Sequence, residues 1–132
     1  MKTLTATSTT TLNKMVELTE DGYIKIDNTG SSFMPVSVEV IFENEKYLIV
    51  SVAHYYCQNS DLMADPEMLF IKVKAHNVYF PSYFKQDGCM GTEQESVIME
   101  NGEIKGYRAK LQADQTSFAN TWLKNIKSQQ NL

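Results

Sequence analysis

The stretch VSVEVIFENEKYLIVSVAHYY, residues 36–56, decides the fold of this chain. Apolar and polar side chains alternate through residues 36–42, and this period of two is typical of a half-buried β-strand. Residues 47–56 are rich in β-branched and aromatic side chains, which favour strands. The polar segment 43–46 separates the two runs, so the stretch predicts a β-hairpin. The residues expected to face the core from the first strand are Val36, Val38, Val40 and Phe42.

Two further hairpins are predicted toward the C-terminus. MLFIKVK (68–74) and VYFPSYF (78–84) predict the first. Because Pro81 cannot donate a ladder hydrogen bond, its strand is expected to lie at an edge or to contain a bulge. ESVIM (95–99) and EIKGY (103–107) predict the second, across an Asn-Gly pair that favours a tight turn.

Helical periodicity occurs near both ends of the chain. Leu12, Met15 and Val16 lie at helical spacing within residues 10–19. A second helix is expected to begin at Asp114, a residue type that caps helix N-termini. Its apolar stripe consists of Phe118, Ala119, Trp122, Leu123 and Ile126.

These elements, with a short strand at 23–26, predict an α+β fold. We expect an antiparallel meander sheet of about six or seven strands, with an N-terminal and a C-terminal helix on one face. Residues 1–9 are rich in Thr and Ser and are predicted to be a flexible N-terminus, while residues 10–130 form a single domain. The sheet face without helices is then open to solvent, a partner or a ligand.

Composition restricts the function classes. The chain has 132 residues, enough for one modest core. No apolar run approaches the ~20 residues of a membrane-spanning helix, and the polar N-terminus lacks the apolar centre of a signal peptide. We therefore expect a cytoplasmic protein that does not enter a membrane, with Cys57 and Cys89 as free thiols.

The distribution of charge argues against a nucleic-acid partner. The net charge is −4, with a balance of −7 over residues 1–100 and +3 over residues 101–132. Proteins that bind duplex DNA gain most of their affinity from contacts of Lys and Arg with phosphates. A protein partner is therefore more consistent with this chain than nucleic acid. An inhibitor that mimics the charge of DNA is an alternative, but the acidic residues are modest in number and scattered.

The stretch HYYCQNSDLMADPEM, residues 54–68, is the candidate site. We interpret residues 58–67 as a loop that crosses between strands, with carboxylate and amide oxygens of the kind that bind hard cations. A purely structural role is the alternative: Asn59 and Asp61 would close turns, and Asp65 would accept backbone N–H groups. The candidate ligand- or partner-binding residues are His54, Tyr56, Gln58, Asn59, Asp61, Asp65 and Glu67.

Known catalytic and metal-binding motifs are not matched. A nuclease-like site would need an acidic residue two positions before Lys72, where the chain has Phe70. The glycine-rich phosphate-binding motifs and the G-x-S-x-G motif of hydrolases do not occur. We assign no catalytic residue, no metal ligand and no cofactor. The alternative hypothesis is a metal-dependent hydrolase or nuclease that uses the carboxylates of Asp61, Asp65 and Glu67.

Three segments, AHYYCQNSDLMADPEM (53–68), FKQDGCMG (84–91) and SFANTWLKNIKSQ (117–129), resemble a small family of uncharacterised domains. Members of this domain-of-unknown-function family occur in bacterial genomes, phages and conjugative elements. The resemblance covers roughly residues 33–130 and departs at Ser60, where the family more often has Gly, and at Lys85, where Gln is more usual. The matching positions are Glu39, His54, Tyr55, Tyr56, Gln58, Asn59, Asp61, Leu62, Met63, Asp65, Pro66, Glu67, Gln86, Asp87, Gly91, Phe118 and Trp122.

The resemblance implies no particular activity, because the family has none established. It implies an origin in phages or mobile elements. Combined with the residue patterns, it leads to an accessory or interaction domain as the first hypothesis. Such a domain would bind a protein or a small ligand through residues 58–67 and the open face of the sheet.

Overall fold

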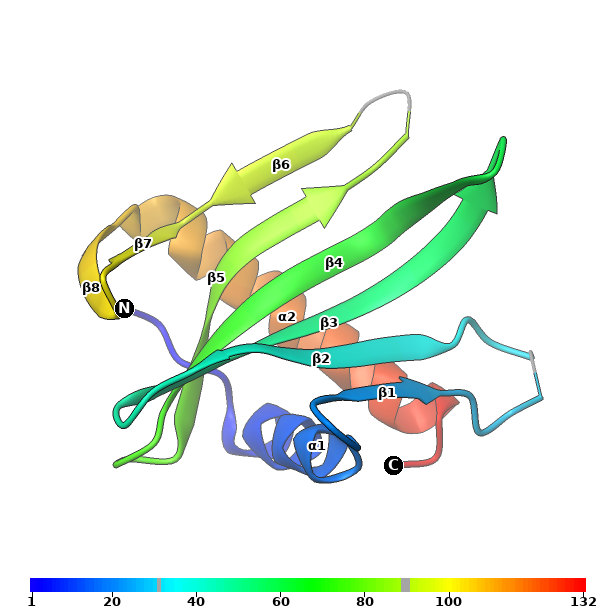
Figure 1. Ribbon diagram of the computed structural model, residues 1–132, viewed down its shortest axis with the longest axis horizontal. Coiled ribbons are helices and arrows are strands. Elements are labelled where there is room, and N and C mark those ends of the chain that lie inside the picture. The colour runs from blue at the N-terminus through cyan, green and yellow to red at the C-terminus, as the bar shows by residue number, and fades with distance from the viewer. Residues whose placement is uncertain (31, 89–90) are drawn as a thin grey trace.

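The computed structural model describes residues 1–30, 32–88 and 91–132 (Figure 1). In this part of the chain a helix stands near each end, with the strands between them. The helices are α1 (Ala6–Glu17) and α2 (Ala109–Gln129), and the strands are β1 (Tyr23–Ile26), β2 (Val36–Glu43), β3 (Tyr47–Gln58), β4 (Asp61–Val73), β5 (Val78–Gln86), β6 (Thr92–Glu95), β7 (Val97–Glu100) and β8 (Glu103–Tyr107).

The strands of the main sheet follow one another in chain order. Over the described residues this sheet has six strands in the order β1-β2-β3-β4-β5-β6, and every neighbouring pair is antiparallel. Strands β7 and β8 form a separate two-stranded sheet. The predicted α+β class, with an antiparallel meander and a helix near each end, is confirmed.

Both helices pack on the same face of the main sheet, where the larger core lies. In Figure 1, α2 passes behind the strands and α1 lies beside its C-terminal half. Apolar residues two apart along β2, β3 and β4 point into this layer, as the period of a strand requires. The core consists of Leu4, Leu12, Met15, Ile26, Val36, Val38, Val50, Val52, Met68, Phe70, Tyr79, Ala119, Trp122, Leu123 and Ile126.

The opposite face is only partly open, because the β7–β8 hairpin covers one end of it. Val97 of β7 is buried against Ile71 of β4 and Phe80 of β5, and Ile49 and Ile104 pack around them. The expectation of a wholly open face is therefore corrected. The small sheet closes the end of the face next to the β4–β5 turn and leaves the middle of the strands uncovered.

The predicted crossing loop at residues 58–67 is wrong. Strands β3 and β4 continue through this stretch and meet at a two-residue turn, Asn59-Ser60, between the paired residues Gln58 and Asp61. Both turn residues have positive φ angles, 53° and 70°, as a type I′ hairpin turn requires. The acidic and amide residues that suggested a loop are the side chains of a β-ribbon, since β-ladders are held by the backbone and admit polar side chains at exposed positions.

Bulges change the side on which several residues lie. Ile41 is an extra residue in β2, between the pairs Val40–Val50 and Phe42–Ile49. A bulge interrupts the alternation of a strand, so Phe42 is 39% exposed instead of belonging to the core. In β5 the register shifts beside Pro81, which pairs with Phe70. The predicted bulge at this proline is confirmed.

The helices begin earlier than predicted. Thr5 caps α1 by accepting a hydrogen bond from the Ser8 backbone N–H, so the helix begins at Ala6 rather than at Thr10. Helix α2 begins at Ala109, and Asp114 is therefore an exposed residue in its second turn rather than its cap. Good helix formers at 109–112 extend the helix backward. The flexibility of residues 1–9 stays a prediction.

The structure also bears on the expectations about membrane-spanning segments and about the two cysteines. Among the described residues, no helix is both long enough and apolar enough to span a membrane. Cys57 is an exposed free thiol, whereas Cys89 lies outside the described residues.

Candidate functional site

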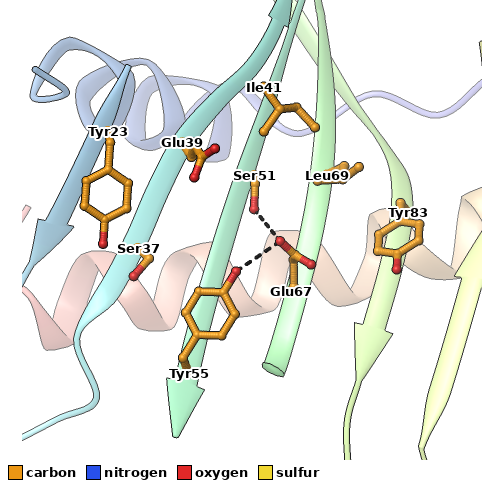
Figure 2. A pocket seen from close by; sticks show the side chains of 9 residues that line it. All are labelled: Tyr23, Ser37, Glu39, Ile41, Ser51, Tyr55, Glu67, Leu69 and Tyr83. Atoms are coloured by element: carbon orange, nitrogen blue, oxygen red, sulfur yellow. Dashed lines mark hydrogen bonds between the residues drawn. The ribbon is translucent and has the colours of Figure 1, made fainter. Parts of the chain in front are cut away.

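A pocket of about 310 Å³ lies on the uncovered part of the sheet face opposite the helices. Figure 2 looks onto this face: the helices lie behind the strands and the pocket side chains stand in front. Residues from β1 to β5 contribute, so the pocket is a property of the whole sheet. It is lined by Tyr23, Ser37, Glu39, Ile41, Ser51, Tyr55, Glu67, Leu69 and Tyr83.

Glu67 lies at the centre of the pocket. Its Oε2 atom accepts hydrogen bonds from the Ser51 hydroxyl at 2.7 Å and from the Tyr55 hydroxyl at 3.1 Å. Ser51 and Tyr55 belong to β3, and Glu67 stands on β4 opposite Ala53, between them. These two hydroxyl donors fix the carboxylate at the floor of the pocket (Figure 2). In the described part of the chain, its other oxygen, Oε1, has no hydrogen-bond partner.

A second carboxylate, Glu39, lies on the other side of Ser51. Glu39 of β2 is paired directly with Ser51 of β3, and Figure 2 shows its carboxylate on the same face as that of Glu67. Among the described residues, neither glutamate forms a salt bridge, and no hydrogen bond reaches the Glu39 carboxylate. The described pocket lining also contains no Lys or Arg. The nearest lysines in the ladder are Lys85, which is paired with Glu67, and Lys25, which is paired with Ser37, and Lys85 forms its salt bridge with Asp87.

Three tyrosines form the walls. Tyr23 is 47% exposed at the β1 side, Tyr55 stands beside Glu67, and Tyr83 lies at the β5 side, where its hydroxyl donates to Glu93 Oε1 at 2.8 Å. An aromatic ring has a negative face, which attracts cations. The carboxylates at the centre and the tyrosines around them therefore both favour a positively charged ligand.

The electrostatics of the pocket keep Tyr55 and Tyr83 protonated. Burial raises the pKa of Tyr55 to about 12, and the negative charges of Glu67 and Glu39 contribute to the increase. Burial also raises the pKa of Tyr83 above its usual value, with further contributions from its hydrogen bond to Glu93 and from nearby carboxylates. Tyr55 is thus a hydrogen-bond donor at neutral pH, and it is not poised to act as a base or a nucleophile.

Of the residues predicted from the sequence, only Glu67 lines this pocket. His54 lies on the opposite face and is 7% exposed. Its Nδ1 donates a hydrogen bond to the Pro35 carbonyl oxygen at 3.0 Å, and its ring contacts Trp122 edge-on with centroids 5.6 Å apart. His54 therefore joins the sheet to α2 and is separated from Glu67 by the sheet itself.

The remaining predicted residues lie along the β3–β4 ribbon. Gln58 and Asp61 pair at its exposed tip, with Asn59 in the turn between them. Asp65 is further back and accepts a hydrogen bond from Gln86 Nε2 at 2.6 Å rather than from the backbone. Tyr56 pairs with Met63 within the ribbon, so none of these side chains enters the pocket.

The Gln86–Asp87 pair shows how two of the motifs quoted from the sequence, residues 53–68 and 84–91, fit together. Asp87 Oδ2 accepts a hydrogen bond from the Ala64 backbone N–H at 2.8 Å, and the Asp87 N–H donates to the Ala64 carbonyl at 2.9 Å. These bonds and the contact between Gln86 and Asp65 join β5 to the irregular part of β4. The polar residues of both motifs therefore stabilise a strand junction.

The three carboxylates of the metal-site alternative do not converge. Asp61 is at the exposed tip, Asp65 is bonded to Gln86, and Glu67 faces the pocket. Six residues of strand separate Asp61 from Glu67, which is roughly 20 Å of extended chain. In the described ranges, no group of three or more His, Cys, Asp or Glu side chains is arranged to hold a metal ion.

Sequence reasoning missed most of the pocket. Glu39 and Tyr55 enter the sequence analysis only as positions of the family resemblance, and no pattern in the sequence groups them with Tyr23, Ser37, Ser51, Leu69 and Tyr83. One signal was present: Ser37 and Glu39, like Ser51, are polar residues at alternate positions of strands whose other face is apolar. Bringing them together requires the register of five strands, and that register includes bulges that the sequence pattern does not reveal.

Comparison with known proteins identifies the family and nothing further. No curated protein and no solved structure matches the chain. The family model described as "Domain of unknown function (DUF6908)" matches residues 7–132, which include both helices and all the strands described above. The chain therefore belongs to the DUF6908 family of domains of unknown function.

Proposed function

We propose that this protein is a non-enzymatic interaction domain that binds a partner protein through the pocket on the uncovered sheet face. The observation that carries the proposal is the pocket around Glu67, in which two carboxylates without ion pairs stand among three tyrosines. Tyrosine-rich concave surfaces with a few fixed polar groups are typical of binding sites. The proposed binding surface lies in the middle of the sheet, whereas the sequence predicted it at residues 58–67.

The surroundings of the pocket favour a protein over an isolated small molecule. Tyr23 and Ile41, on the pocket rim, are 47% and 46% exposed, and the neighbouring Phe42 is 39% exposed. These side chains extend apolar surface beyond the pocket, where a small ligand would leave it uncovered. A peptide segment lying across β1 and β2 would bury this surface, and apolar burial contributes roughly 25 cal/mol per Å².

Selection from a random peptide library displayed on phage tests this function. We expect enriched peptides that bind the wild-type protein and lose binding when Ser37→Trp fills the pocket. Ser117→Trp, on the exposed side of α2, is the matched control and should leave binding intact. Circular dichroism and thermal unfolding establish that both variants are folded. If no peptide is enriched, or if Ser37→Trp binds the enriched peptides as well as wild type, the proposed function is wrong.

We also propose a cellular context for the protein, because its sequence resembles domains of phages and mobile elements. The protein would act in the cytoplasm as an accessory component of such an element. Cell fractionation with an antibody to the native protein tests the location, and recovery outside the cytoplasmic fraction would contradict it.

A further inference from the structure

We infer that the group bound in the pocket is an arginine side chain of the partner, held between Glu39 and Glu67 and against the tyrosine rings. This inference rests on the proposed function and names the chemistry of its occupant. It follows from three features of the site: its charge, the spacing of its two carboxylates and the nature of its walls.

The charge of the pocket favours a cationic occupant. Burying even one carboxylate under a neutral partner removes it from water without compensation, which is unfavourable. Here two carboxylates share one pocket, and among the described residues neither forms a salt bridge, since Lys85, the cross-strand neighbour of Glu67, pairs with Asp87 instead. A partner that covers this surface is therefore favoured if it supplies positive charge.

The placement of the carboxylates favours a forked donor over a single-point donor. Glu39 on β2 is paired with Ser51 and Glu67 on β4 with Ala53, so their backbones are two strands apart and offset by two residues, roughly 12 Å in all. Their side chains lean toward the centre (Figure 2). A guanidinium group has five N–H donors in a plane and can bond two carboxylates at once, whereas an ammonium group acts as one compact charge.

The walls of the pocket match the flat faces of a guanidinium group. Tyr23 and Tyr83 lie on opposite sides of the pair of glutamates, and Tyr55 lies between them (Figure 2). Arginine stacks on aromatic rings while its edge forms hydrogen bonds. The Tyr55 and Ser51 hydroxyls already donate to Glu67 Oε2, which leaves Oε1 for a donor on the ligand.

NMR titration with N-acetyl-arginine methylamide tests the inference directly. We expect saturable shifts of the backbone amides of Ser51, Tyr55 and Glu67, and none with N-acetyl-citrulline methylamide, which has the same shape without the charge. Glu67→Gln and Glu39→Gln should each weaken binding roughly twofold to fivefold, the range of a partly exposed charge pair. Glu45→Gln, which changes an exposed carboxylate outside the pocket, is the control and should have no effect.

An arginine introduced into the protein itself gives an independent readout. Ser37→Arg places a guanidinium beside Glu39 in the pocket, and we expect its Tm to exceed that of Ser37→Gln. The gain should disappear in the Glu39→Gln, Glu67→Gln background. An equal Tm for Ser37→Arg and Ser37→Gln would show that the pocket does not stabilise a guanidinium and would overturn the inference.

The peptide-library selection and the titration with the arginine analogue together distinguish failure of the inference from failure of the proposed function. Library peptides that occupy the pocket without containing arginine, together with no shifts from the arginine analogue, would overturn the inference and leave the binding function in place. Equal affinity for N-acetyl-lysine methylamide would overturn the assignment of a guanidinium group. Absence of any pocket ligand in either experiment would overturn both.

Discussion

At the scale of single residues, the protein fixes one carboxylate by surrounding it with hydroxyl groups. Ser51 is 6% exposed and Tyr55 is half-buried, so their hydrogen bonds to Glu67 form in a region with little competing water. Bonds to a charged acceptor are stronger than those between neutral groups. Glu67 is consequently presented in one orientation before any ligand arrives.

Glu67→Gln should lower the pKa of Tyr55 toward its usual value. Burial is the main cause of the present value of about 12, and the negative charge of Glu67 is the next. Removing that charge leaves the burial effect, so the pKa should fall but stay above 10. NMR of protein labelled at the tyrosine Cζ measures this titration. Glu43→Gln, outside the pocket, should leave it unchanged, and an unaltered pKa in Glu67→Gln would contradict the assigned interaction.

The same residue predicts how stability depends on alkaline pH. A tyrosine whose pKa is higher in the folded than in the unfolded state contributes stability that is complete below pH 10. That contribution is lost as the pH rises from about 10 to about 12. Tyr55→Phe should therefore show a shallower loss of stability across this interval in urea titrations. A wild-type slope that persists in Tyr55→Phe would show that other groups are responsible.

At the scale of elements, the β3–β4 hairpin uses a turn residue that its geometry does not favour. Ser60 has a φ angle of 70°, a region in which side chains other than Gly and Asn are strained. The Asn101-Gly102 turn of the β7–β8 hairpin has the same pair of positive φ angles, 55° and 77°, with Gly at the second position. Serine rather than glycine at position 60 therefore changes the strain of the turn and not its shape.

Ser60→Gly should stabilise the protein by about 0.5–1 kcal/mol, because relief of the strain exceeds the added flexibility of the unfolded chain. Urea unfolding measures the difference. Gly102→Ser is the reverse control and should be destabilising, since a Cβ atom there would come 3.0 Å from Asn44 Nδ2. A loss of stability in Ser60→Gly would show that the serine side chain contributes more than its backbone strain costs.

Strands and helices could be predicted from periodicity, but their boundaries and registers could not. The alternation in 36–42 and the Asn-Gly pair at 101–102 identified two hairpins correctly. The acidic residues of 61–67 were misinterpreted as a loop, because composition alone does not distinguish an exposed ribbon from a turn. The pocket depends on side chains that adjacent strands bring together, and a one-residue bulge such as Ile41 moves a side chain to the other face.

At the scale of the whole molecule, amide side chains of α2 join segments that are far apart in the sequence. Gln112 bonds to both backbone groups of Lys2, with Oε1 accepting at 2.8 Å and Nε2 donating at 2.7 Å. Gln130, at the other end of the helix, bonds to Asn28 and Met34. Both glutamine side chains are fully buried. Sequence patterns gave no sign of this role, because amides near an apolar stripe usually face solvent.

Gln112→Ala should destabilise the protein by roughly 1–3 kcal/mol, the cost of leaving buried hydrogen-bonding groups without partners. Because Gln112 holds Lys2, the amides of Lys2 and Leu4 should exchange with deuterium faster than in wild type. Gln129→Ala, on the less buried side of α2, is the matched control and should change neither quantity. Unchanged exchange at Leu4 in Gln112→Ala would contradict the anchoring role.

The outer part of the β3–β4 ribbon extends beyond its neighbouring strands, and this affects the tendency of the protein to aggregate at high concentration. Its ladder with β2 ends at Ala53 and its ladder with β5 begins at Glu67, so the outer part of the ribbon is paired chiefly with itself. Projecting strand edges are templates for uncontrolled addition of further chains, and natural proteins protect them with charge. Asp61 at the tip supplies that charge beside Leu62, which is 65% exposed. The acidic residue that first suggested a metal ligand is thus a charge of the kind that opposes extension of a sheet by neighbouring molecules.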